Sequence, residues 1–175
     1  HESFMKNAAL KVIIMQLQNV GLSVKQAFRA HEKYGALAEE MIMENPYRMI
    51  DDIYGIGFER ADRIAEHMGI DKEAPFSVEN GIKHVLKLAL NEGHTCLPEG
   101  ILIKKTSDII GVDIPLVEKS IAELAIRGDI AKKIYAGVTA VFLAYAYIAE
   151  SETARRLYML YKSEPKMKIK DIRSE

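Results

Sequence analysis

Two short turns that contain glycine, each set between two helical patterns, constrain this chain more than any other feature of its sequence. The first turn lies at residues 20–23 and reads Val-Gly-Leu-Ser, and the second lies at residues 54–58 and reads Tyr-Gly-Ile-Gly-Phe. Apolar residues recur with helical spacing on both sides of each turn. The sequence therefore predicts the same helical hairpin twice, joined by a short helix, with the two copies sharing one core.

The residues of the two turns allow two interpretations. Ser23 and Gln26 have the spacing of a capping box, which predicts that a helix begins at Val24. Gly55 and Gly57 have no Cβ, so they fit either a sharp structural turn or a helix amino terminus that a phosphate can approach. Both interpretations remain open from the residues alone.

A different pattern begins after residue 74, with Ser77 and Asp113 as candidate helix caps and Ala136-Gly137 as a candidate hairpin turn. The order helix, strand, helix, helix, strand, strand is typical of a winged helix-turn-helix domain. The expected elements are helices at 77–90, 99–111, 114–127 and 151–162, an extended segment at 94–98, and strands at 129–135 and 139–147.

These patterns predict a mainly α protein. We expect a tandem helix-hairpin-helix domain at residues 1–73, a winged-helix-like domain with a small β-hairpin at 74–148, and a C-terminal helix and linker at 149–175. The chain begins without methionine and ends in a lysine-rich segment, so we expect it to be part of a longer protein.

Composition limits the functional classes. The 24 basic and 25 acidic side chains give a net charge of -1, which is not the global basic signature of a strong nucleic-acid binder. Cys96 is the single cysteine, which excludes an internal disulfide and fits a reducing compartment, and we expect it to be buried. No apolar run reaches the ~20 residues of a membrane helix, and no signal peptide is visible, so we expect a cytoplasmic protein without a membrane partner.

The hairpins are the best candidates for a binding site. Each exposes N–H groups at the start of its second helix, where Lys25, Arg60 and Arg63 are within reach of a phosphate. Such contacts hold the DNA backbone and carry no sequence code. Acidic residues such as Glu59 and Asp62 share the second helix, and residues 1–74 contain 9 basic and 12 acidic side chains. Phosphate contact and simple packing therefore both remain possible for each hairpin.

The winged-helix-like region offers a second route to DNA through its helix at 114–127. Residues 113–129 contain two basic and four acidic side chains, which favours a structural or protein-packing role over reading of a major groove. Four lysines form either a small basic edge near the wing or a solvated face: Lys104, Lys105, Lys132 and Lys133.

The sequence contains no recognisable catalytic machinery. It has no phosphate-loop motif of the form G-x-x-x-x-G-K-[ST], and its histidines have no metal-ligand spacing with Cys96. No nucleophile stands beside a plausible base. We therefore expect no catalytic residue, no metal site and no cofactor in these 175 residues.

Several short strings together resemble one family. They are Asn-Pro-Tyr-Arg at 45–48, Gly-Ile-Gly-Phe at 55–58, Ala-Asp at 61–62 and Gly-His-Thr at 93–95. In combination they resemble the N-terminal region of RecD-like DNA helicases, the exodeoxyribonuclease V alpha chain family, and the resemblance covers nearly the whole chain. In that family this region precedes a superfamily 1 motor that moves 5′ to 3′ along single-stranded DNA using ATP and Mg²⁺.

The resemblance implies an accessory DNA-binding region of an ATP-dependent helicase that acts in DNA repair and recombination. Its partners would be DNA, bound weakly and without sequence preference as a single strand, and the motor domains of the parent chain, which would hold ATP and Mg²⁺. The alternative is a protein-interaction scaffold that docks the motor or a partner without touching DNA. The resemblance implies DNA contact at both turns, at Gly21, Leu22 and Ser23 and at Gly55, Ile56 and Gly57.

Overall fold

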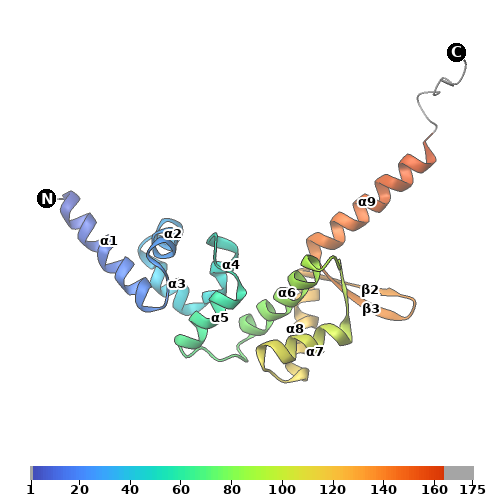
Figure 1. The fold of residues 1–175 in the computed structure, drawn as a ribbon, viewed down its shortest axis with the longest axis horizontal. Coiled ribbons are helices and arrows are strands. Elements are labelled where there is room, and N and C mark those ends of the chain that lie inside the picture. Colours follow the sequence, from blue (N-terminus) through green and yellow to red (C-terminus); the bar gives the residue numbers. More distant parts are fainter. Residues whose placement is uncertain (1, 164–175) are drawn as a thin grey trace, which may run out of the picture.

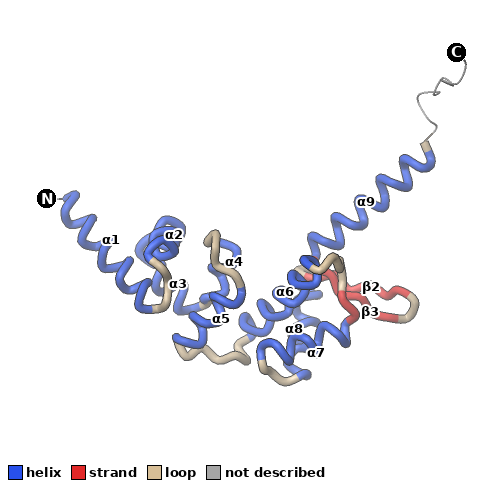
Figure 2. Tube along the Cα trace, in the orientation of Figure 1, coloured by secondary structure: helices blue, strands red, loops and turns tan. Residues whose placement is uncertain are grey.

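The computed structural model describes residues 2–163 of the chain, which is mainly helical with one small sheet (Figures 1 and 2). The helices of the first half pack beside α6, and α9 projects away from the sheet (Figure 1). Among residues 2–163, no helix has both the length and the apolar character needed to cross a membrane.

The first half contains the two predicted helix–turn–helix segments. We call α1, its turn and α2 the first hairpin, and α4, its turn and α5 the second hairpin. Ser23 and Gln26 form the predicted capping box, in which each side chain bonds the backbone N–H of the other residue. The elements are α1 (Glu2–Asn19), α2 (Val24–Tyr34), α3 (Ala38–Glu44), α4 (Met49–Asp52) and α5 (Phe58–His67), with 3₁₀ turns at Gly35–Leu37 and Pro46–Arg48.

The glycines of the two turns have different backbone roles. Gly21 and Gly55 adopt φ angles of +97° and +91°, which side chains with a Cβ rarely tolerate. Gly57 has a φ of -99°, which any residue adopts, and a Cβ placed there would meet nothing within 4 Å. The backbone conformation therefore favours glycine at residue 55, whereas at residue 57 it would allow any side chain.

The second half follows the predicted order of elements. Its three antiparallel strands lie in the order β1-β3-β2. The expected turn joins β2 to β3, with Ala136 and Gly137 both at positive φ, as two-residue hairpin loops require. The elements are α6 (Pro75–Asn91), β1 (Leu97–Pro98), α7 (Glu99–Ile110), α8 (Ile114–Arg127), β2 (Ile130–Tyr135), β3 (Val138–Leu143) and α9 (Ala144–Lys162).

Two of the predicted boundaries in this half are wrong. The strand expected to reach residue 147 ends at Leu143, which pairs with Ile130, the first residue of β2. With no partner strand beyond that pair, the following segment satisfies its backbone groups as a helix, and α9 begins at Ala144 instead of residue 151. Cys96, expected to be buried, is only half-buried, and this partial burial raises the pKa of its thiol.

Ser77 is not the cap of α6. The helix begins at Pro75, whose ring presets a helical φ, and this places Ser77 inside the first turn. Its buried hydroxyl lies 2.7 Å from the hydroxyl of Tyr47, in the first half of the chain. Buried apolar side chains from both halves form one continuous core, so α6 is packed firmly against the hairpins.

Two helical glycines provide a test of how closely α6 packs against α7. A Cβ on Gly81 would stand 2.8 Å from Cγ2 of Ile110, where α6 meets α7, whereas a Cβ on Gly100 would meet nothing within 4 Å. We expect Gly81→Ala to lower the free energy of unfolding by about 1–3 kcal/mol through overpacking. Gly100→Ala should raise it by about 0.5 kcal/mol through helix propensity. Urea denaturation of both variants measures the difference, and equal effects would contradict the close approach of α6 and α7.

Candidate nucleic-acid interface

The two hairpin turns are held together by a reciprocal pair of hydrogen bonds. The Gln26 side chain donates from Nε2 to the carbonyl of Gly55 at 3.4 Å, and the Arg60 guanidinium donates to the carbonyl of Gly21. Gln26 and Arg60 occupy equivalent positions, because each stands five residues after the positive-φ glycine of its own turn. Each hairpin therefore satisfies a turn carbonyl of the other.

A second arginine strengthens this contact. Arg29 donates from Nη1 to the carbonyl of Tyr54 at 2.6 Å, and its guanidinium lies 5.4 Å from the centre of the Tyr54 ring. The residue after the positive-φ glycine of each turn, Leu22 or Ile56, is buried in the core. The turns are thus fixed relative to each other by their carbonyls and apolar side chains, and their helix starts remain at the surface.

The two helix starts differ in how their N–H groups are satisfied. At the start of α2, the Ser23 hydroxyl accepts from the Gln26 N–H at 3.3 Å, and Lys25 lies exposed beside it. At the start of α5, Gly57 occupies the cap position and has no side chain to offer. The second hairpin therefore presents an open helix amino terminus, where the helix dipole favours an anion.

This open terminus borders a cleft of 460 Å³ between α5 and α6, which we call the α5–α6 cleft. Four basic side chains and one acidic side chain contribute to its walls. The lining residues are Ile50, Gly57, Phe58, Glu59, Arg60, Arg63, Asn80, Lys83, His84, Lys87, Leu88 and Asn91. The cleft brings together three residues predicted from sequence, Gly57, Arg60 and Arg63, whereas Lys25 and the first turn lie outside it.

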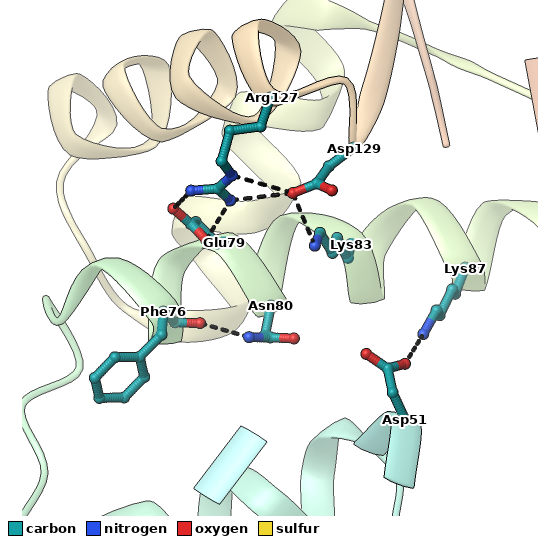
Figure 3. Close-up of polar contacts among 8 residues, drawn as sticks. All are labelled: Asp51, Phe76, Glu79, Asn80, Lys83, Lys87, Arg127 and Asp129. Carbon is teal, nitrogen blue, oxygen red and sulfur yellow. Dashed lines mark hydrogen bonds and ion pairs between the residues drawn. The ribbon is translucent and has the colours of Figure 1, made fainter. Parts of the chain in front are cut away.

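The lysines of α6 face acidic partners on neighbouring elements (Figure 3). Lys87 lies 3.9 Å from Asp51 of α4, and Lys83 lies 3.2 Å from Asp129, which follows α8. Arg127 donates to Asp129 as well and forms two bonds to Glu79, at 2.8 and 2.6 Å. This network ties the end of α8 to α6 and holds Lys83 on the wall of the cleft.

An aromatic stack forms part of the cleft wall. The ring of His84 lies on the ring of Phe58 with centroids 4.5 Å apart and an angle of 16° between the planes. Burial lowers the pKa of His84. The positive charge of Lys87 lowers it further, and the negative charge of Glu59 acts in the opposite direction. The imidazole is therefore neutral at neutral pH and acts as a flat apolar surface rather than a cation.

The buried phenol of Tyr47 joins the two walls of the cleft. Its hydroxyl donates to Asp62 of α5 at 2.5 Å and lies 2.7 Å from the hydroxyl of Ser77 on α6. Its ring packs between those of Phe58 and Phe76, at 5.7 and 6.0 Å. Burial and the bond to Asp62 raise the pKa of Tyr47, so the phenol stays protonated and able to donate.

Sequence reasoning missed the contributions of Tyr47, Lys83 and Lys87 to this site. In the sequence, Tyr47 stands out only as part of the Asn-Pro-Tyr-Arg string, and the two lysines belong to no motif. The i, i+4 spacing of Lys83 and Lys87 does place them on one face of a helix, but no local signal shows what that face opposes. Among residues 2–163, no group of three His, Cys, Asp or Glu side chains is arranged to hold a metal ion.

Comparison with protein families assigns the first half of the chain. Residues 6–96 match the model described as the ATP-dependent RecD2 DNA helicase HHH domain. The chain belongs to this family. The resemblance read from the short sequence strings is therefore confirmed over residues 6–96. The match to the RecD2 HHH domain begins within α1 and includes both turns, the second hairpin and all of α6, so both walls of the cleft lie within it.

The Tyr47 hydroxyl gives the first test of the RecD2 HHH site. Tyr47→Phe keeps the ring but removes the bonds to Asp62 and Ser77, leaving a buried serine hydroxyl without its partner. We expect the free energy of unfolding to fall by about 1–2 kcal/mol. Urea denaturation gives this value, with Tyr54→Phe as the control because the Tyr54 side chain is exposed. Equal stability of the two variants would show that the phenol does not join α5 to α6.

Asp129 gives a test that depends on pH. Burial acts to raise the pKa of Asp129, but hydrogen bonds from Arg127 and Lys83 outweigh it and hold the pKa below the ordinary carboxyl value. A carboxyl with a lowered folded-state pKa stabilises the protein above its unfolded pKa, about 3.9. That stabilisation is lost as the pH falls through the lower folded-state value.

We therefore expect the parent to be more stable than Asp129→Asn at pH 6, and the difference to shrink as the pH is lowered below about 4. Denaturant midpoints between pH 3 and pH 7 measure it. Asp108→Asn serves as the control, because Asp108 lies on the exposed surface of α7 outside this network. A difference that stays constant over the whole range would contradict the ion-pair network.

Proposed function

We propose that this chain is the accessory DNA-binding region of an ATP-dependent 5′–3′ DNA helicase of the RecD-like family, acting in DNA repair and recombination. In this proposal, residues 1–73 form a tandem helix-hairpin-helix domain, residues 74–148 form a winged-helix-like domain, and residues 149–175 lead toward the motor. The order of α6, β1, α7, α8, β2 and β3 supports the winged-helix assignment.

One observation carries the DNA-binding proposal. The second helix of the second hairpin, α5, begins without a side-chain cap, and this amino terminus borders a cationic cleft. A phosphate at the start of α5 can accept from free backbone N–H groups and meet the guanidinium of Arg63. The bond from Arg60 to Gly21 gives Arg60 the additional role of holding the first turn in place. The first hairpin, capped by its own Ser23 and Gln26, would contact DNA mainly through Lys25.

The expected binding is weak and independent of sequence. Backbone contacts read no base, and only a few cations face the cleft. Because the salt dependence of binding grows with the number of neutralised phosphates, we expect a shallow decline of log K with log salt. ATP and Mg²⁺ would be bound by the motor of the parent helicase, since these 175 residues contain no phosphate-loop motif.

A second candidate function is protein docking, and α9 favours it. This helix carries exposed apolar side chains along its final turns, where a soluble helix normally presents polar residues. The exposed residues are Leu157, Tyr158, Met159, Leu160 and Tyr161. They fit a surface that docks the motor or another protein, and such docking requires no DNA contact by the hairpins.

Gly57→Ser separates these two functions. The backbone of Gly57 resembles that of Ser23, so a serine there can cap α5 as Ser23 caps α2, which preserves or slightly raises stability. The new hydroxyl and Cβ would occupy the phosphate position, and we expect affinity for a fluorescein-labelled single-stranded oligonucleotide to fall about tenfold. Fluorescence anisotropy at low and moderate salt measures this loss.

Arg63→Ala should weaken binding to a similar degree, and Lys25→Ala to a smaller one. Lys119→Ala is the matched control, because it removes one positive charge from the exposed face of α8. If the parent does not bind the oligonucleotide at low salt, or if Gly57→Ser and Arg63→Ala bind as tightly as the parent, the turns are packing devices and the docking function is favoured.

A further inference from the structure

The α5–α6 cleft contains two lysines that the hairpin contact does not use. Lys83 and Lys87 lie one turn apart on α6 and line the wall opposite Arg63. Their side chains remain 30% and 44% exposed, so both are accessible to a ligand. Cations on two separate helices thus converge on one hollow of 460 Å³.

We propose that this cleft binds one nucleotide of single-stranded DNA, with Lys87 as a phosphate ligand and the base against Leu88 and Ile50. The inference rests on the proposed function and extends it, because it continues the bound strand from the start of α5 onto α6. It also names single-stranded DNA, rather than a duplex, as the ligand of the cleft.

The ion pairs of the two lysines separate their roles. Asp51, the partner of Lys87, is 82% exposed and 3.9 Å away, so this pair contributes little and exchanges readily for a phosphate. Lys83 is paired at 3.2 Å with Asp129, which Arg127 also holds. Lys87 is therefore the available phosphate ligand, and Lys83 remains in its network with Asp129 (Figure 3).

The size of the cleft selects a single strand. Its volume lies within the roughly 300–1,000 Å³ of small-ligand sites, which suits one nucleotide. A duplex is much broader, since its major groove alone is about 12 Å wide. Leu88 is partly exposed in the cleft, and the stacked rings of Phe58 and His84 add a flat apolar wall. Such surfaces accept the face of any base and give affinity without sequence preference.

The test measures binding of a fluorescein-labelled thymidine oligonucleotide to the full chain by anisotropy over a range of salt concentrations. We expect Lys87→Ala to weaken binding about three- to tenfold and to reduce the slope of log K against log salt by about 0.7, the value of one phosphate contact on a single strand. Asp51→Asn should tighten binding, because it releases Lys87. Lys119→Ala, with the same loss of charge on α8, should bind like the parent.

Two further probes examine the nucleotide itself. A duplex of the same length should bind more weakly than the single strand, and should be insensitive to Lys87→Ala. An oligonucleotide of abasic sites should bind more weakly than the thymidine strand. Equal affinity for the duplex would overturn the single-strand assignment, and equal affinity for the abasic strand would overturn the base contact.

The outcomes distinguish this inference from the proposed function. If Lys87→Ala binds like Lys119→Ala while Gly57→Ser and Arg63→Ala lose affinity, the hairpin contact stands and the cleft is not part of the site. If the parent fails to bind any oligonucleotide at low salt, both the proposed function and the cleft inference are wrong. Circular dichroism of each variant confirms that a loss of binding is not a loss of fold.

Discussion

The position of α6 against the hairpins depends on one buried phenol. Tyr47 is almost completely buried, and its hydroxyl bridges Asp62 on α5 and Ser77 on α6. A buried hydroxyl that lost these partners would carry the cost of desolvation, so the two helices are held at the spacing that the phenol sets. These two helices supply most of the cleft wall, and the network of Arg127, Asp129 and Glu79 then holds Lys83 in place on it.

The paired hairpins show how one structural unit can be used twice with different results. Both turns need glycine at positive φ, and both give a carbonyl to the other hairpin. They differ at the cap position, where Ser23 closes the first helix start and Gly57 leaves the second open. In the first hairpin a side-chain cap satisfies a backbone N–H group at the helix start and stabilises the fold. In the second hairpin the N–H groups at the helix start are left for an anion.

Electrostatics shows the largest difference between sequence and structure. Along the sequence, acidic side chains outnumber basic ones over residues 1–74, and a local charge count argues against DNA. In the folded protein, two arginines of α5 and two lysines of α6 line one cleft with Glu59, while Asp51 and Asp129 pair with the lysines from neighbouring elements. Because the potential at a site depends on distance in space and on burial, net charge along a segment is a poor guide to it.

The sequence by itself determined the local elements whose chemistry is contained within a few residues. The capping box at Ser23, the glycine turn at Gly55 and the hairpin turn at Ala136 and Gly137 depend on neighbouring atoms, and all three could be predicted. Membership of the RecD2 HHH family could also be predicted, because the short motifs that indicate it are present in the sequence itself.

Only the tertiary structure decided which residues meet. Ser77 fits the local pattern of a helix cap, but its hydroxyl instead lies beside that of Tyr47. This partner is thirty residues away, so the local pattern does not indicate it. The strand predicted to residue 147 ends at Leu143 because β2 offers no further backbone to pair with. The sequence does not indicate a role for Lys87, because its partner Asp51 lies on α4 and the opposite wall of the cleft on α5. Each of these features depends on contacts between segments that are distant in the sequence. Local residue patterns do not specify such contacts, because they form only when the common core packs.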